Sequence, residues 1–168
     1  YNYLTDKITS APTVEDPNIW LPFNIGKVRS AGFDLVAGTD FHSGDWTASL
    51  DARYSYQDAV DATPDSYTYG QQIAYIAKHT VTADLKAGWK GYVLNPRWVF
   101  KSGRTDSYGE LANWNTLDVS LSKCFAVKNS LSISVYFSAK NLFDKEYELV
   151  SGYPMPGRRF IGGIQFGF

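Results

Sequence analysis

Histidine and cysteine, two residue types that often serve in nucleophilic catalysis, are rare in this 168-residue sequence. The two histidines, His42 and His79, have no serine or cysteine partner at a spacing diagnostic of nucleophilic catalysis. Cys124 is the single cysteine, which excludes an internal disulfide and a cysteine-based metal site. We therefore expect an inert thiol, structural histidines and a protein that is not an enzyme.

Three carboxylates, Asp58, Asp61 and Asp65, lie in one predicted loop. Calcium prefers clustered oxygen ligands, but this spacing matches no calcium motif, and solvated loop carboxylates are the favoured interpretation. We therefore expect neither a metal nor a cofactor. The net charge of −1, without a long basic or acidic run, also argues against nucleic acid as a partner.

Apolar and polar residues alternate with a period of two along most of the chain, the pattern of a β-strand with two different faces. The alternation is clearest in residues 46–57, 92–101, 131–140 and 159–168. Weaker examples in residues 1–8, 33–37, 81–85 and 117–122 bring the total to about eight strands of about 10 to 14 residues. Soluble sheets use shorter strands, whereas a strand that crosses a bilayer needs about 9 to 11 residues.

Short and long connections between these strands alternate. The short turns cover residues 42–45, 88–91 and 126–129. The long loops cover residues 11–25, 58–71, 103–113 and 144–157. Outer-membrane barrels combine short periplasmic turns with long extracellular loops. If the C-terminus lies in the periplasm, every short turn is periplasmic and every long loop is extracellular. No apolar stretch is long enough for a membrane-spanning helix.

Aromatic residues, 16% of the chain, gather near the connections. We expect a lower girdle at the short turns, made of Phe41, Trp46, Trp89, Tyr92, Phe125, Phe166 and Phe168. We expect an upper girdle from Tyr54, Tyr56, Trp98 and Trp114. A soluble β-sandwich would instead bury these rings in its core.

Charged residues on the opposite face favour a wet barrel interior over such a sandwich. The predicted lumen cations are Arg53, Arg97, Lys101, Lys140 and Arg159. Their expected role is to pair with acidic residues such as Asp51 and Asp118 or with carboxylates of a partner domain. Guidance of an anionic substrate is the second interpretation.

Several segments resemble known motifs of outer-membrane receptors. The last six residues, GIQFGF (163–168), resemble the signal read by the outer-membrane assembly machinery, with Gly163, Phe166 and Phe168 as its key positions. Residues 140–147, KNLFDKEY, and 152–158, GYPMPGR, resemble the entry and exit of the last extracellular loop of TonB-dependent receptors. Residues 75–79 and 24–34 resemble two earlier segments of the same family, with Ala74 and Ala77 replacing prolines and Asp34 replacing a glutamate.

This resemblance implies an all-β chain, a transmembrane antiparallel β-barrel. Residues 1–168 would supply about the last eight strands of a barrel of about 22 strands, with the plug domain absent from this chain. The implied partners are outer-membrane lipid, the rest of the receptor and, through the plug, the TonB energy complex. The implied location is the outer membrane of a Gram-negative bacterium.

The implied function is active import of a large, scarce nutrient. Cobalamin is favoured over a ferric siderophore or haem, because residues 142–147 and 152–158 look most like the cobalamin-transporter branch of the family. In this family extracellular loops contact the substrate, and the candidates here are Tyr67, Tyr69, Tyr108, Trp114, Tyr147, Tyr153 and Met155. The same side chains could equally anchor the membrane interface or pack the loops. The sequence leaves open the ligand, the oligomeric state, the reason for a start inside a strand, and whether a surface lipoprotein caps the loops.

An autonomous eight-stranded outer-membrane barrel with a structural or adhesin role is the alternative. Eight strands can close around a filled interior. The start inside a predicted strand and the order of the receptor-like segments favour the larger receptor.

Overall fold

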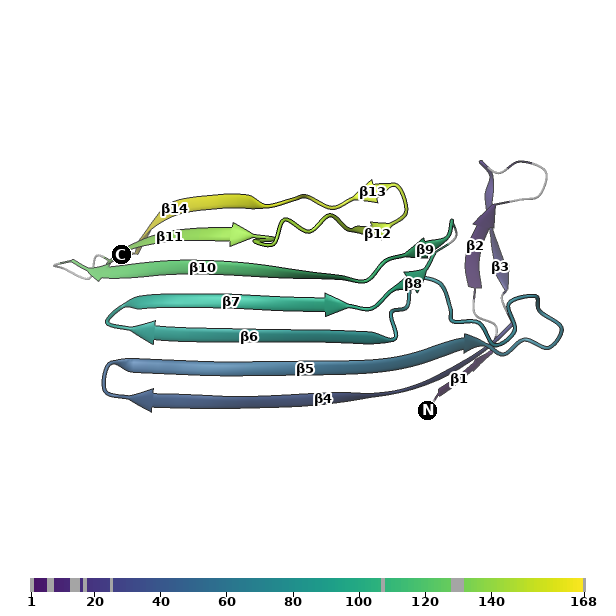
Figure 1. Ribbon diagram of the computed structural model, residues 1–168, viewed down its shortest axis with the longest axis horizontal. Helices are drawn as coiled ribbons and strands as arrows, with labels where there is room; N and C mark the ends of the chain where they lie inside the picture. The colour runs from purple at the N-terminus through teal and green to yellow at the C-terminus, as the bar shows by residue number, and fades with distance from the viewer. Residues whose placement is uncertain are drawn as a thin grey trace.

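The computed structural model describes residues 2–5, 8–12, 16, 18–24, 26–106, 108–127 and 132–167. These residues form strands and turns, and no helix capable of crossing a membrane is found among them. Eight strands make one antiparallel sheet in which each strand pairs with the next sheet strand along the chain (Figure 1). In sheet order they are β1 (Asn2–Thr5), β4 (Lys27–Ser43), β5 (Trp46–Asp61), β6 (His79–Trp89), β7 (Tyr92–Lys101), β10 (Trp114–Ala126), β11 (Ser132–Lys140) and β14 (Arg159–Gly167).

The predicted all-β antiparallel fold is confirmed. The longest strands, β4 with 17 residues and β5 with 16, exceed the 9 to 11 or so that cross a bilayer. Among the described residues the sheet is open, with β1 and β14 each paired on one side only.

Three small hairpins lie at the loop end of the sheet, away from the short turns (Figure 1). They are β2 (Ile8–Pro12) with β3 (Trp20–Asn24), β8 (Arg104–Thr105) with β9 (Glu110–Leu111), and β12 (Glu148–Val150) with β13 (Tyr153–Pro154). The β8–β9 and β12–β13 hairpins fall inside connections that the sequence indicated only as long and polar. These loops are therefore folded structures. The predicted strand over residues 1–8 is wrong in extent, because only β1 joins the sheet and Ile8 pairs with Asn24 in the first hairpin.

The predicted loop 58–71 is wrong in its boundaries. Strand β5 continues to Asp61 because its pairing with β4 extends to the Val28–Asp61 pair. The Ala62 N–H then donates to the Lys27 carbonyl at 2.8 Å, and β6 begins only at His79. The connection thus runs from residue 62 to residue 78.

Two of the short turns owe their tightness to backbone conformations with positive φ. Lys90 and Gly91 have φ of 45° and 79°, as a type I′ turn requires at both central positions. Gly44 has φ of 57° at the first central position of the β4–β5 turn, where a type II′ turn favours glycine. The predicted turn 126–129 lies partly outside the described residues.

The strand register puts apolar and charged residues on opposite faces of the sheet. Phe33 is opposite Tyr56, and Leu50 is opposite Leu85. The same face continues to the Val135–Ile164 pair of β11 and β14. Because directly opposed residues share a face, one apolar face extends from β4 to β14.

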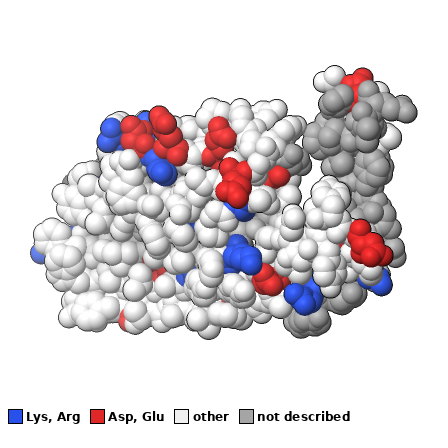
Figure 2. Space-filling model, turned by 45° about the vertical axis from the view of Figure 1, so that its right-hand side comes forward, with Lys and Arg blue, Asp and Glu red and all other residues white. Residues whose placement is uncertain are grey.

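The other face carries the charged residues. One row crosses six strands and contains, in sheet order, Asp51, Asp84, Arg97, Asp118, Lys140 and Arg159. The Lys140 Nζ atom lies 2.9 Å from Asp118 Oδ2, and Arg97 Nε lies 3.6 Å from Asp84 Oδ1. The predicted pairing of a lumen cation with Asp118 is therefore present. Figure 2 shows one side of the molecule, on which charged side chains gather in small groups separated by wide uncharged areas.

Aromatic rings mark the short-turn end of the apolar face. Trp46 and Trp89 stack with ring centroids 5.4 Å apart, and Trp89 stacks on Tyr92 at 6.2 Å. Phe166 is opposite Ile133 on the same face. This is the arrangement expected of a lower girdle, although Phe168 lies outside the described residues.

We predict that the sheet tolerates a new arginine on its charged face but not on its apolar face. In protein folded into lipid vesicles, Leu50→Arg should lower the free energy of unfolding by about 2–4 kcal/mol, because the apolar face is the one expected to meet hydrocarbon. The neighbouring Ser49→Arg, on the charged face, should cost much less. Equal losses in the two variants would contradict the assignment of the faces.

Candidate functional site

Two loops at the loop end of the sheet are joined by contacts from Arg104 and Asp106. The Arg104 Nη2 atom donates to the carbonyl oxygens of Glu148 at 3.3 Å and Leu149 at 3.0 Å. The Asp106 carboxylate accepts the Ser151 N–H at 2.7 Å. Arg104 and Asp106 are both buried. The β8–β9 and β12–β13 hairpins are thereby held as one unit.

Asp106 also organises its own hairpin. Its carboxylate accepts the N–H groups of Tyr108 at 2.8 Å and Gly109 at 3.0 Å. Desolvation by burial alone would raise the pKa of this carboxyl, but hydrogen bonds from Ser151, Tyr108 and Gly109 outweigh it and lower the pKa to about 2. The contact between the loops thus depends on an ionised carboxylate.

Asn141 holds the two ends of the last loop together. Its Nδ2 donates to the carbonyls of Lys145 at 2.9 Å and Pro156 at 3.3 Å, and its Oδ1 accepts the Lys145 N–H at 3.0 Å. Its own N–H donates to Asp118 Oδ1 at 2.9 Å. The φ of 48° is one that asparagine tolerates. The segments KNLFDKEY and GYPMPGR therefore meet in space.

Asp144 adds a second link between the same segments. Its Oδ1 accepts the Arg158 N–H at 2.7 Å, and its Oδ2 lies 3.7 Å from Arg158 Nη2. A Cβ atom at Gly157 would lie 2.9 Å from Asp144 Oδ1, too close for an ordinary contact. The glycine before Arg158 therefore leaves room for the carboxylate, which a Cβ atom would push aside.

Trp114, the first residue of β10, packs against the last loop. It is buried, and its ring lies 4.4 Å from the ring of Tyr147, centroid to centroid. The register with Lys101 puts Trp114 on the charged face, so its predicted place in the upper girdle is wrong. Burial raises the pKa of Tyr147, and the nearby Asp118 carboxylate raises it further.

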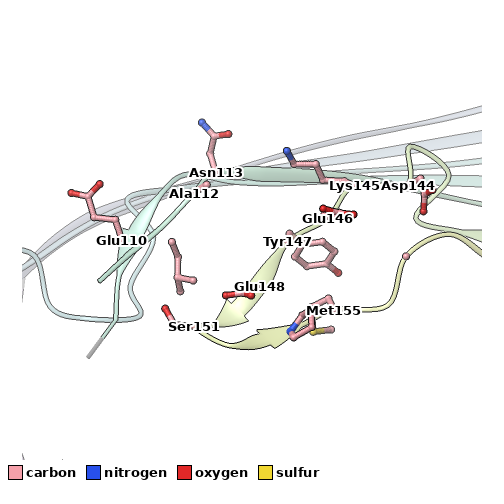
Figure 3. A pocket seen from close by; sticks show the side chains of 13 residues that line it. Glu110, Ala112, Asn113, Asp144, Lys145, Glu146, Tyr147, Glu148, Ser151 and Met155 are labelled. Atoms are coloured by element: carbon pink, nitrogen blue, oxygen red, sulfur yellow. The ribbon is translucent and has the colours of Figure 1, made fainter. Parts of the chain in front are cut away.

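A pocket of about 580 Å³ lies between the joined loops (Figure 3). One wall comes from β9 and the residues after it, and the other from the loop before β12 and from β13. Tyr147 and Met155 line it, and the Met155 N–H donates to the Tyr147 carbonyl at 2.9 Å. The charged lining residues are Glu110, Asp144, Glu146, Glu148 and Lys145, so the lining is mainly acidic.

The remaining candidates lie outside this pocket. Tyr67, with 95% of its surface exposed, and Tyr69 lie in the loop between β5 and β6. Tyr108 and Tyr153 are exposed on the β8–β9 and β12–β13 hairpins. The structure thus brings together Trp114, Tyr147 and Met155 from the predicted set.

Comparison with known families agrees with this architecture. A family model described as TonB dependent receptor-like, beta-barrel matches residues 1–142. The chain belongs to the TonB-dependent receptor family. Members of this family are transporters in the outer membrane of Gram-negative bacteria and are not enzymes.

In this TonB-dependent receptor chain, sequence reasoning missed the polar residues that build the pocket. Arg104, Asp106 and Asn141 were not predicted as site residues, although each makes several of the contacts described above. Asn141 lies in the segment KNLFDKEY, which resembles a family motif. The motif therefore pointed to this residue, but the hydrogen bonds that explain its role could be seen only in the structure. Arg104 and Asp106 lay in a segment read only as a polar loop.

The histidines and loop carboxylates considered for catalysis or metal binding make ordinary structural contacts. The His79 Nδ1 atom lies 2.9 Å from the Tyr54 hydroxyl, and His42 is exposed at the end of β4. The Asp61 carboxylate accepts hydrogen bonds from Ser66 and Thr68 and braces its own loop. Among the described residues no group of three or more potential metal ligands occurs.

Part of the predicted assembly signal lies in β14. A Cβ atom at Gly163 would lie within 2.7 Å of three atoms of the Tyr136 phenol, so the glycine leaves room for that side chain. Phe166 is exposed on the apolar face. Phe168 lies outside the described residues, and the role of the signal stays a prediction.

We predict that Asn141→Ala releases the last loop. The variant loses three side-chain hydrogen bonds at a buried position, which should cost about 2–4 kcal/mol. Amide exchange in residues 145–157 should then become much faster. The exposed Asn113→Ala is the matched control, and similar exchange in both variants would show that Asn141 does not hold the loop.

The contact through Asp106 should also depend on pH. A carboxyl whose pKa is lowered by folding stabilises the loop fully above its ordinary pKa, about 4. This contribution is lost as pH falls through about 2. Protection of the Ser151 amide should follow this range in the native protein, while Asp106→Asn should remove the dependence. A loss of protection already complete at pH 5 would contradict this assignment.

Proposed function

We propose that residues 1–168 form the C-terminal part of the barrel of a TonB-dependent transporter that imports cobalamin. The ordered receptor-like segments support this placement. The open sheet supports it as well, because unpaired edges at β1 and β14 would leave backbone groups unsatisfied in lipid. The rest of the receptor, including a plug that contacts the TonB energy complex, would complete the barrel.

The pocket between the joined loops is the observation that carries the proposal. Its volume of about 580 Å³ falls in the usual range of about 300–1,000 Å³ for ligand sites. Tyr147 and Met155 offer apolar contact area, and the buried Trp114 fixes the position of Tyr147. A large ligand would use this pocket together with loops from the remainder of the receptor.

Cobalamin is preferred to the other family substrates for two reasons. The segments around Tyr147 and Met155 are those that resemble the cobalamin-transporter branch, and both contribute to the wall of the pocket. The mainly acidic lining also disfavours an anionic ferric siderophore. A haem receptor would be favoured by a loop-tip histidine, and the predicted long loops contain none.

Tyr67, Tyr69, Tyr108 and Tyr153 form a second part of the proposal. All four are exposed on loops at the extracellular end. Aromatic side chains there can give a ligand large contact area at low entropic cost. We assign them to the first encounter with the substrate, before it reaches Tyr147 and Met155.

Binding of cobalamin to the complete receptor tests the proposal. Tyr147→Ala and Met155→Ala should each weaken binding about tenfold or more, since each removes contact area worth more than about 1.4 kcal/mol. Phe41→Ala, at the periplasmic end, is the control and should leave binding unchanged. Titration calorimetry with cobalamin, a ferric siderophore and haem gives the ranking. Binding of haem or a siderophore instead of cobalamin would overturn the substrate assignment.

A further inference from the structure

The apolar face of the sheet carries one charge where none is expected. The face can be followed by register between the two ends of the long strands, through residues 33–41, 46–56, 81–89, 92–100, 117–125, 133–139 and 160–166. Within these described ranges, Lys123 is the only Asp, Glu, Lys or Arg that points outward. It lies opposite Tyr92 on β7 and Val135 on β11. A lysine facing lipid is tolerated near the interface and costly at the centre of the bilayer.

The surroundings of Lys123 hold its ammonium group at the periplasmic interface. The Nζ atom lies 4.0 Å from the centroid of the Tyr92 ring and 5.7 Å from that of Phe125. It also donates to the Lys90 carbonyl in the β6–β7 turn. No carboxylate among the described residues lies within ion-pair distance of it, whereas Lys90 itself is 3.6 Å from Asp45. An ammonium group has three donors, so this arrangement leaves it able to bind an anion.

A groove begins beside this ammonium group. It has a volume of about 280 Å³ and is walled by Tyr92, Leu121, Phe125, Val135 and Phe137. Leu121 is opposite Phe137, and this pair lies two residues further along β10 and β11 from the turn that joins these strands than the Lys123–Val135 pair. The apolar part of the groove therefore extends from the charged group toward the middle of the membrane.

We propose that Lys123 and this groove bind one phospholipid of net negative charge in the periplasmic leaflet. The phosphate would accept hydrogen bonds from the Lys123 ammonium, and an acyl chain would lie over Leu121, Val135 and Phe137. Charge complementarity supports an anionic head group, because a cation without a carboxylate partner stands at the interfacial end of an otherwise uncharged surface. The rings of Tyr92 and Phe125 limit the directions from which the phosphate can approach.

Native mass spectrometry of the complete receptor tests this assignment. The receptor is extracted into neutral detergent and exposed to equal amounts of phosphatidylglycerol and phosphatidylcholine. The wild type should retain one phosphatidylglycerol in preference to phosphatidylcholine. Lys123→Met should lower the retained fraction about fivefold or more, whereas Lys123→Arg should keep it.

Lys86→Met is the matched control, since Lys86 lies opposite Ser49 on the charged face of β6 and should not affect retention. A second variant, Leu121→Trp, keeps the ammonium group and fills the groove, and it should also reduce retention. It keeps the test decisive if Lys123→Met fails to insert, which the loss of heat-modifiable migration would reveal.

Three results would overturn the proposal. The first is equal retention in the wild type, Lys123→Met and Leu121→Trp, which would leave Lys123 as a snorkelling lysine without a lipid. The second is equal retention of both lipids. The third is displacement by inorganic phosphate at millimolar concentration, which would show that the acyl chain contributes nothing. None of these results depends on which nutrient the receptor imports.

Discussion

Backbone hydrogen bonding in a medium without water is the constraint on which this structure depends. Each N–H and C=O in the hydrocarbon must find a partner, and paired strands in a closed sheet meet this demand. Pairing forces side chains to alternate, so lipid and lumen receive different residues from the same strand. The apolar face and the row from Asp51 to Arg159 are two consequences of one register.

The same register explains how much the sequence could predict. The alternation of apolar and polar residues in 46–57 and 131–140 identified the strands, because this pattern can be read from neighbouring residues and recurs along the chain. The turns at residues 42–45 and 88–91 could be placed because glycine marks the tight bend in both. The extent of β5 was misjudged, since the pairing that extends it to Asp61 comes from β4, far away in sequence.

The candidate site was harder to predict because its parts are joined by long-range polar contacts. Tyr147 and Met155 were identified as aromatic or apolar loop residues, but nothing local linked them to Arg104 or Asp106. Trp114 looked like an interface anchor, and only its register with Lys101 put it on the inner side. A side chain such as Asn141 could be recognised as part of a motif, while its partners 4 and 15 residues away required the fold.

The central claim is that this sheet is part of a larger receptor barrel. The intact mass of the detergent-extracted protein under denaturing conditions, compared with its native size, tests it most directly. We expect the 168 residues to be accompanied by further barrel strands and a plug, either in the same chain or as a tightly bound companion. A stable, heat-modifiable monomer made of these 168 residues alone would contradict the account and favour an autonomous eight-stranded barrel.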